Sequence, residues 1–192
     1  MTLLLFYLFF ALIISFLCSV MEAVLLSTSL SYLKVKQDSG SKSATILIKL
    51  KENIDRPLSA ILSLNTIAHT LGAAGVGVQV TKVFGEVYFG IASAILTVLI
   101  LFLSEIIPKT LGARFWRELA SICSHAIRVT LIIAYPLVIM SAYITRLFSK
   151  NYTEQTTSRE EISALANIGE EEGIFGEKEN KIIQNLKINV FP

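Results

Sequence analysis

Three long apolar stretches, separated by polar segments, dominate the first 107 residues of the chain. They cover about residues 3–27, 57–80 and 87–107, and each is close to the ~20 residues that a helix needs to cross a bilayer. Apolar runs of this length indicate membrane spans rather than the core of a soluble domain. The pattern therefore predicts an all-α integral membrane protein with three transmembrane helices, the first two joined by a polar loop over about residues 34–56.

A fourth apolar stretch, over residues 129–145, differs from the other three. It is short for a crossing and has Pro136 at its centre. Basic residues flank it on both sides: Arg128, Arg146 and Lys150. Because a crossing would leave one of these basic sets outside, we interpret residues 118–148 as a pair of juxtamembrane helices on the cytoplasmic surface, broken at Pro136. A fourth span is the alternative.

The C-terminal part of the chain is polar and acidic. From residue 151 onward, eight Glu stand against four Lys or Arg. Ser158 followed by Glu161 forms a capping box at the start of a predicted helix, and a second helix is predicted over about residues 177–186. We therefore divide the chain into a transmembrane domain, residues 1–150, and an acidic cytoplasmic helical connector, residues 151–192.

The composition agrees with a membrane protein and argues against several other classes. Of the 192 residues, 53% are hydrophobic and 17% charged, against about 45–50% and about 25% in an ordinary soluble domain. The net charge of +2 indicates no nucleic-acid partner. Cys18 and Cys123 lie in apolar surroundings without a C-x-x-C spacing, so we expect buried thiols rather than a disulfide or metal site. The two His are far apart, and no Ser/His/Asp set indicates an enzyme.

The distribution of basic residues predicts the orientation of the three spans. The loop after the first span carries Lys34, Lys36, Lys42, Lys49, Lys51 and Arg56, whereas the second connector has only Lys82. Lys109, Arg114 and Arg117 follow the third span. Since basic loops stay in the cytoplasm, we expect an inner- or plasma-membrane protein with its N-terminus outside and its C-terminus cytoplasmic.

Polar residues inside the first two spans are candidates for function, because membrane spans penalise such side chains. Ser15, Ser19 and Glu22 follow a spacing of i, i+4 and i+7, which places them on one helix face. The alternative is that the serines bond back to their own helix and Glu22 meets water. In the second span Asn65 and His69 are i, i+4 neighbours. An unpaired buried amide costs about 1–3 kcal/mol, so Asn65 needs a partner.

The third span ends in a carboxylate and a proline. Pro108 lacks the N–H that would bond the carbonyl of Ser104 four residues earlier. A freed carbonyl would then lie beside the carboxylate of Glu105, although Glu105 could instead pair with Lys109 at i+4. Together with the hydroxyls and the amide of the other spans, this inventory of oxygen donors suits Mg²⁺ or Ca²⁺ better than zinc or copper.

These residues also carry a resemblance to a known family. Serine followed by glutamate in the first span, "NT" in the second and "EIIPKT" closing the third resemble the transmembrane domain of the CNNM/CorC family of cyclin M-like magnesium transporters. The resemblance covers about residues 1–150, and the tail is similar to the acidic connector that precedes the paired CBS domains of the family.

The resemblance implies a function and a site. It implies Mg²⁺ transport, with export in exchange for Na⁺, by a homodimer with three crossings and a cytoplasmic belt of juxtamembrane helices. It implies that Mg²⁺, as the transported or bound ion, lies among Ser19, Asn65, Glu105 and the backbone at Ser104, with Ser15 and Glu22 as nearby candidates. The expected partners are membrane lipid and a second copy of the chain.

The chain departs from the family pattern in three places. Ser104 stands where the family often has glycine, and "LNTIAH" replaces "GNTxxN", with Leu64 for glycine and His69 for the second asparagine. The sequence ends at Pro192, where CBS domains would begin, so this chain is either a shortened form of a longer protein or one in which the CBS pair is absent, and we expect no nucleotide binding by these residues. The alternative function is a non-transporting membrane regulator or scaffold whose polar residues only pack helices.

Overall fold

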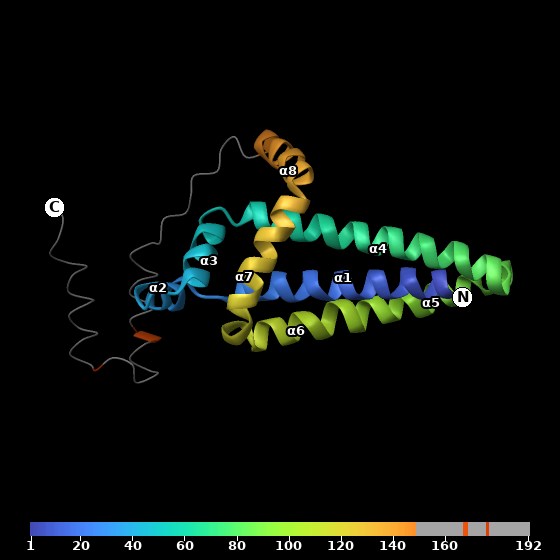
Figure 1. The fold of residues 1–192 in the computed structure, drawn as a ribbon, viewed down its shortest axis with the longest axis horizontal. Helices are drawn as coiled ribbons and strands as arrows, with labels where there is room; N and C mark the ends of the chain where they lie inside the picture. The colour runs from blue at the N-terminus through green and yellow to red at the C-terminus, as the bar shows by residue number, and fades with distance from the viewer. Residues whose placement is uncertain (149–166, 169–175, 177–192) are drawn as a thin grey trace. The chain divides into compact units, whose positions relative to one another are not determined.

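The computed structural model describes residues 1–148, 167–168 and 176, and every regular element in these residues is helical (Figure 1). Three helical runs are long and apolar enough to cross a membrane: α1 (Thr2–Ser27), α4 (Asp55–Phe84) and Glu86–Arg114. The prediction of an all-α membrane protein with three transmembrane helices is therefore confirmed. The second and third runs extend beyond their predicted ends.

The third run continues through Pro108, so the predicted stop at this proline is wrong. It comprises η1 (Glu86–Tyr88), α5 (Phe89–Leu99), the π-helical segment η2 (Ile100–Ile106) and α6 (Ile107–Arg114). Within the wider turn of η2, the amide of Ile107 donates to the carbonyl of Phe102, five residues earlier. Pro108 lies in the first turn of α6, where its missing N–H is tolerated.

The connector between the first two spans is helical, which corrects the predicted loop. It forms α2 (Leu30–Asp38) and α3 (Lys42–Glu52). Each helix begins at a serine whose hydroxyl accepts from a backbone amide, Ser29 from Tyr32 and Ser41 from Ala44. Each helix also buries one leucine in the core: Leu33 and Leu47. Capping and these two anchors hold helices whose sequences are otherwise mostly polar.

After the third span, α7 (Trp116–Ile133) and α8 (Tyr135–Phe148) form the predicted pair of helices, bent by 79°. The turn lies at Ala134 rather than at Pro136, because a proline is tolerated in the first turn of a helix. The capping box at Ser158 and the helix over residues 177–186 lie outside the described residues. The placement of α7 and α8 at the membrane surface stays a prediction.

The central element of the bundle is α1, which lies between α4 and the third span and also contacts α7 (Figure 1). Two glycines allow this close packing. A Cβ at Gly72 of α4 would overlap the Cβ of Ala11, and one at Gly112 of α6 would lie 2.8 Å from the Cβ of Ala23. The small residues thus set the spacing of α1 from both neighbours.

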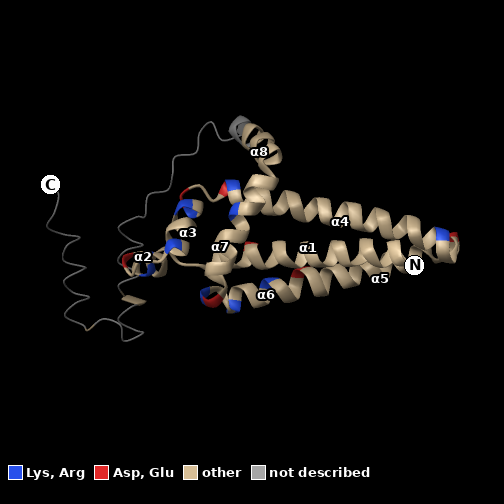
Figure 2. Cartoon of the chain, viewed as in Figure 1, with Lys and Arg blue, Asp and Glu red and all other residues tan. Residues whose placement is uncertain are grey.

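Most charged residues lie at one end of the described bundle, on α2, α3 and the adjoining parts of α6 and α7 (Figure 2). A smaller charged group lies at the far end of α4, and long parts of α1, α4 and α5 between the two ends carry none (Figure 2). A lysine from the more charged end fixes the last turn of α1. Lys51 Nζ donates to the carbonyls of Leu25 at 2.7 Å and Thr28 at 2.6 Å, and burial lowers the pKa of this amine from its ordinary value. Long uncharged helices between charged ends are typical of membrane-spanning helices.

Candidate metal centre

The carbonyl of Ser104, in the π-helical segment η2, is the point where the first and third spans meet through hydrogen bonds. Pro108 offers no N–H to this carbonyl. Instead, Ser19 Oγ donates to it at 2.7 Å and Ser15 Oγ at 3.4 Å. All three serines are fully buried. The hydroxyls of Ser15 and Ser19 therefore donate to the third span rather than to carbonyls of their own helix.

The second span joins this group through His69. Its Nε2 lies 2.5 Å from Ser15 Oγ, and its Nδ1 lies 3.8 Å from Glu105 Oε1. Glu105 follows Ser104 directly and its side chain is 34% exposed. One imidazole thus stands between a hydroxyl of α1 and a carboxylate of the third span, so all three membrane helices contribute to one polar cluster. We define the polar cluster as Ser15, Ser19, His69, Ser104 and Glu105.

Asn65 lies one turn before His69, on the same face of α4. Its Oδ1 is buried and accepts no hydrogen bond from the residues that the structure describes. An acceptor left in this condition costs about 1–3 kcal/mol. Such an atom is a group that a cation would satisfy.

Glu22 lies apart from the polar cluster, although the sequence places it on the same stripe as Ser15 and Ser19. Its Oε2 is 3.2 Å from Lys109 Nζ, and this ion pair joins α1 to α6. The ion pair between Glu105 and Lys109, considered from sequence, is therefore replaced by one between Lys109 and Glu22. The structure does not bring Glu22 into the group of candidate ligands.

The sequence interpretation left His69 out of the candidate ligands. The residue was visible only as a departure from the family pattern, yet its i+4 spacing from Asn65 already placed both on one face. What the sequence lacked was the position of Ser15 on another helix. The hydroxyl of Ser104 was also a candidate, but it bonds back to the carbonyl of Ile100 at 2.7 Å, so only the backbone oxygen of Ser104 faces the other helices.

The chemistry of the cluster favours a hard cation. The described residues contain no group of three or more His, Cys, Asp or Glu that could hold a metal ion, which argues against a zinc site of the usual kind. The donors of the polar cluster are a backbone carbonyl, hydroxyls and one carboxylate, with one imidazole beside them, and the amide oxygen of Asn65 lies one turn away from His69 on α4. Oxygen donors at an irregular segment of a membrane helix are typical ligands of a transported hard cation.

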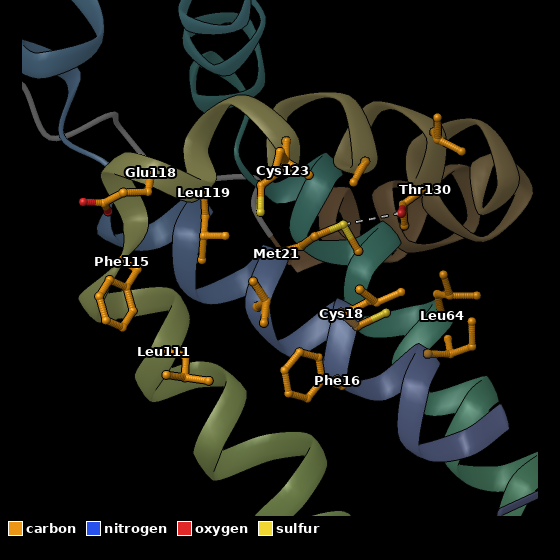
Figure 3. Close-up of a pocket in the computed structure, with 16 residues that line it drawn as sticks. Phe16, Cys18, Met21, Leu64, Leu111, Phe115, Glu118, Leu119, Cys123 and Thr130 are labelled. Carbon is orange, nitrogen blue, oxygen red and sulfur yellow. Dashed lines mark hydrogen bonds between the residues drawn. The ribbon is translucent and has the colours of Figure 1, made fainter. Parts of the chain in front are cut away.

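A separate apolar pocket, of about 780 Å³, lies between α1, α4, α6 and α7 (Figure 3). It shares no residue with the polar cluster. Cys18 and Cys123 both line it as buried free thiols, as the sequence predicts, and Thr130 Oγ1 lies 3.8 Å from Met21 Sδ. Its lining is apolar except for Glu118 and Thr130, which come singly, whereas the polar cluster brings a carboxylate, a backbone carbonyl and hydroxyls together, so the candidate metal centre is the polar cluster.

Three helices long and apolar enough to cross a membrane, which converge on a polar cluster and are followed by a bent helix pair, define an integral membrane domain. The chain belongs to the family of cyclin M transmembrane N-terminal domains, whose sequence pattern it matches over residues 6–179. This finding confirms the family resemblance of the sequence.

Several known proteins are similar to the chain in sequence. The chain is 34% identical over 178 residues to the UPF0053 protein sll1254 of Synechocystis, covering 93% of this chain and 51% of that protein. It is 32% identical over 130 residues to a UPF0053 protein of Haemophilus influenzae, covering 68% and 30%. It is 29% identical over 111 residues to the UPF0053 inner membrane protein YfjD of Escherichia coli, covering 58% and 26%. The chain spans about half the length of the first relative, and less of the others.

Proposed function

We propose that this domain forms the membrane part of a divalent-cation transporter with Mg²⁺ as its cargo. The observation that supports this function is the Ser104 carbonyl, which lies beside the Glu105 carboxylate and accepts from two hydroxyls of another span. A backbone oxygen beside a carboxylate at an irregular turn of a membrane helix is the kind of ligand pair that a hard cation binds.

Each candidate ligand has a distinct role in the proposal. Glu105 supplies the negative charge, and the Ser104 carbonyl supplies a neutral oxygen at a fixed position. Ser15 and Ser19 hold that carbonyl in place and offer their own oxygens, and Asn65 contributes the amide oxygen that has no partner among the described residues. Mg²⁺ takes six oxygen ligands in an octahedral arrangement and usually keeps several waters, so the protein needs to supply only some of them.

Direction, coupling and assembly follow from the family resemblance. We propose export of Mg²⁺ in exchange for Na⁺, by a homodimer in a lipid membrane, with the N-terminus outside and the charged end of the bundle in the cytoplasm. The six basic residues before the second span support this orientation.

Reconstitution into liposomes tests the transport function. Mg²⁺ flux into or out of vesicles containing the wild type is compared with that of Glu105→Ala, which removes the charged ligand. Glu86→Ala is the matched control, since Glu86 is exposed and lies in the turn between α4 and α5. We expect flux from the wild type and from Glu86→Ala, and little from Glu105→Ala. Equal flux from all three proteins would overturn the site assignment.

The hydrogen bonds of the polar cluster also favour a second candidate, a membrane regulator or scaffold. The bonds from Ser15 and Ser19 to Ser104 join two helices and need no ion for that role. A thermal-shift titration separates the two functions. The transporter predicts stabilisation by Mg²⁺ that is lost in Asn65→Ala, and the scaffold predicts no Mg²⁺-dependent stabilisation in either protein.

A further inference from the structure

We propose that His69 is a nitrogen ligand of the candidate metal centre. Together with Glu105 it gives the site a higher affinity for divalent cations of the first transition row than for Mg²⁺. This inference rests on the proposed function, which requires a divalent cation at the polar cluster. It adds a donor of different chemistry to a set that is otherwise made of oxygen.

One tautomer of His69 lets Ser15 make both of its contacts at once. In it the single O–H of Ser15 donates to the carbonyl of Ser104, and the oxygen of Ser15 accepts a hydrogen bond from Nε2–H of His69, 2.5 Å away. In this tautomer the other ring nitrogen, Nδ1, carries the lone pair. A histidine that ligates a metal typically gives its second N–H to a neighbouring oxygen in this way.

Nδ1 of His69 lies opposite the carboxylate of Glu105, at a distance that one metal ion could bridge. The distance from Nδ1 to Oε1 is 3.8 Å, which is too long for a hydrogen bond. Two ligands bound to one ion at roughly 2.0–2.2 Å each can lie up to about 4 Å apart. The pair is thus close enough to share one cation and makes no hydrogen bond of its own.

The identity of the donor decides the selectivity. Mg²⁺ prefers oxygen ligands, whereas imidazole suits the later first-row divalent ions, and affinity for a mixed nitrogen and oxygen site rises from Mn²⁺ to Ni²⁺. Asparagine at the same position would offer an amide oxygen and lose this preference. Mg²⁺ still has the carbonyl, hydroxyl and carboxylate oxygens, so its transport is compatible with the histidine.

The second histidine of the chain is the natural control. His125 lies on α7, is exposed, and its Nδ1 interacts with the Ser121 carbonyl and the Ser124 hydroxyl of its own helix. It has no carboxylate opposite its ring among the interactions of the described residues. Substituting it should leave the selectivity unchanged.

Metal binding to the purified chain tests the inference directly. Affinities for Mg²⁺ and Ni²⁺ are measured by calorimetry on the untagged wild type, His69→Asn, His125→Asn and Glu105→Gln, because a polyhistidine tag would itself bind Ni²⁺. We expect the ratio of Ni²⁺ to Mg²⁺ affinity to fall at least about tenfold in His69→Asn, the lower end of what losing even an outer-shell partner costs a metal site. The ratio should not change in His125→Asn.

Pulsed electron paramagnetic resonance of the Mn²⁺-loaded wild type gives a second readout that does not depend on a variant folding. We expect the coupling of one imidazole nitrogen to the ion, present in His125→Asn and absent from His69→Asn. Wild type without nitrogen coupling, together with an unchanged affinity ratio in His69→Asn, would overturn the nitrogen ligand while leaving the cation site standing. If instead neither ion binds, or both bind Glu105→Gln as they bind the wild type, the proposed function fails and this inference with it.

Discussion

The two glutamates of the membrane spans face different partners. Glu22 of α1 lies 3.2 Å from the ammonium of Lys109, and its side chain is 17% exposed. Glu105 of η2 faces the imidazole of His69 at 3.8 Å and is twice as exposed. The ion pair with Lys109 ties α1 to α6. Glu105 has no lysine or arginine partner among the described residues, and for this reason we propose it, rather than Glu22, as the charged ligand.

The comparison teaches that the partner, rather than the sequence position, separates a structural carboxylate from a candidate ligand. Both glutamates lie where α1 meets the third span, and both were ligand candidates from sequence, Glu22 by its helical spacing from Ser15 and Ser19 and Glu105 by its position beside the Ser104 carbonyl. Their partners differ because α1 contacts both η2 and α6, and α6 carries Lys109 opposite Glu22 whereas η2 carries no lysine.

The largest loss of stability and of Mg²⁺ binding should come from a substitution that forces α1 away from α4. It disrupts the polar cluster and leaves the ion pair between Glu22 and Lys109 in place. In Gly72→Ala the new Cβ would overlap the Cβ of Ala11, and overpacking costs typically about 1–3 kcal/mol. Because Ala11 precedes Ser15 by one turn, the shift also moves the hydroxyl from His69. We expect a lower melting temperature in detergent and a weakened Mg²⁺ shift. Gly90→Ala, with open space at its Cβ, should melt like the wild type.

Replacing Asn65 with leucine should separate stability from ion binding. The substitution removes a buried oxygen without a partner among the described residues. Without Mg²⁺, the free energy of unfolding of Asn65→Leu should therefore exceed that of the wild type by up to about 1–3 kcal/mol, which thermal melting detects. The same variant should lose Mg²⁺-dependent stabilisation. A variant that is destabilised without Mg²⁺ would show that the oxygen has a structural partner and would contradict its assignment as a free ligand.

Removing one hydroxyl should have a smaller effect. Ser19→Ala deletes the 2.7 Å bond to the Ser104 carbonyl, worth about 0.5–1.5 kcal/mol, and should weaken Mg²⁺ binding by a similar free energy in a calorimetric titration. Ser104→Ala is the matched control, because its hydroxyl bonds only within its own helix and the carbonyl remains. If Ser104→Ala weakened binding more than Ser19→Ala, the hydroxyl rather than the carbonyl would be the ligand.

The smallest effect on stability is expected from removing the ion pair between Glu22 and Lys109. Lys109 is 45% exposed, and ion pairs in such positions contribute about 0–1 kcal/mol. A double-mutant cycle of Glu22→Gln and Lys109→Met, read by thermal melting, should give a coupling in this range. A much larger coupling would mean that the pair stabilises the interface between α1 and α6 more than its exposure allows.

The sequence predicted those parts of the fold that depend on the length of apolar runs. The three spans follow from the thickness of a bilayer, which any continuous run of about 20 apolar residues must match. The helices α2 and α3 were missed because their stability comes from the burial of Leu33 and Leu47 against helices distant in sequence. The continuation through Pro108 was missed because a π-helical turn has no signature in a single sequence.

For the candidate site, the sequence predicted the chemistry at one turn but not the contacts between helices. The argument from Pro108 identified the Ser104 carbonyl, which the structure shows accepting hydrogen bonds from Ser15 and Ser19. The separation of Glu22 from Glu105, and the entry of His69, depend on which lysine and which serine face them from another helix. These pairings are properties of packing, and their ligand roles stay predictions until an ion is bound.

A Mg²⁺ thermal-shift titration of three proteins in parallel, the wild type, Glu105→Gln and Glu22→Gln, tests the central claim most directly. A ligand at 100 times its dissociation constant stabilises a protein by about 2.7 kcal/mol. We predict this stabilisation in the wild type and in Glu22→Gln, and its loss in Glu105→Gln. Mg²⁺ stabilisation that persists in Glu105→Gln, or that disappears in Glu22→Gln instead, would contradict the assignment of Glu105 as the charged ligand.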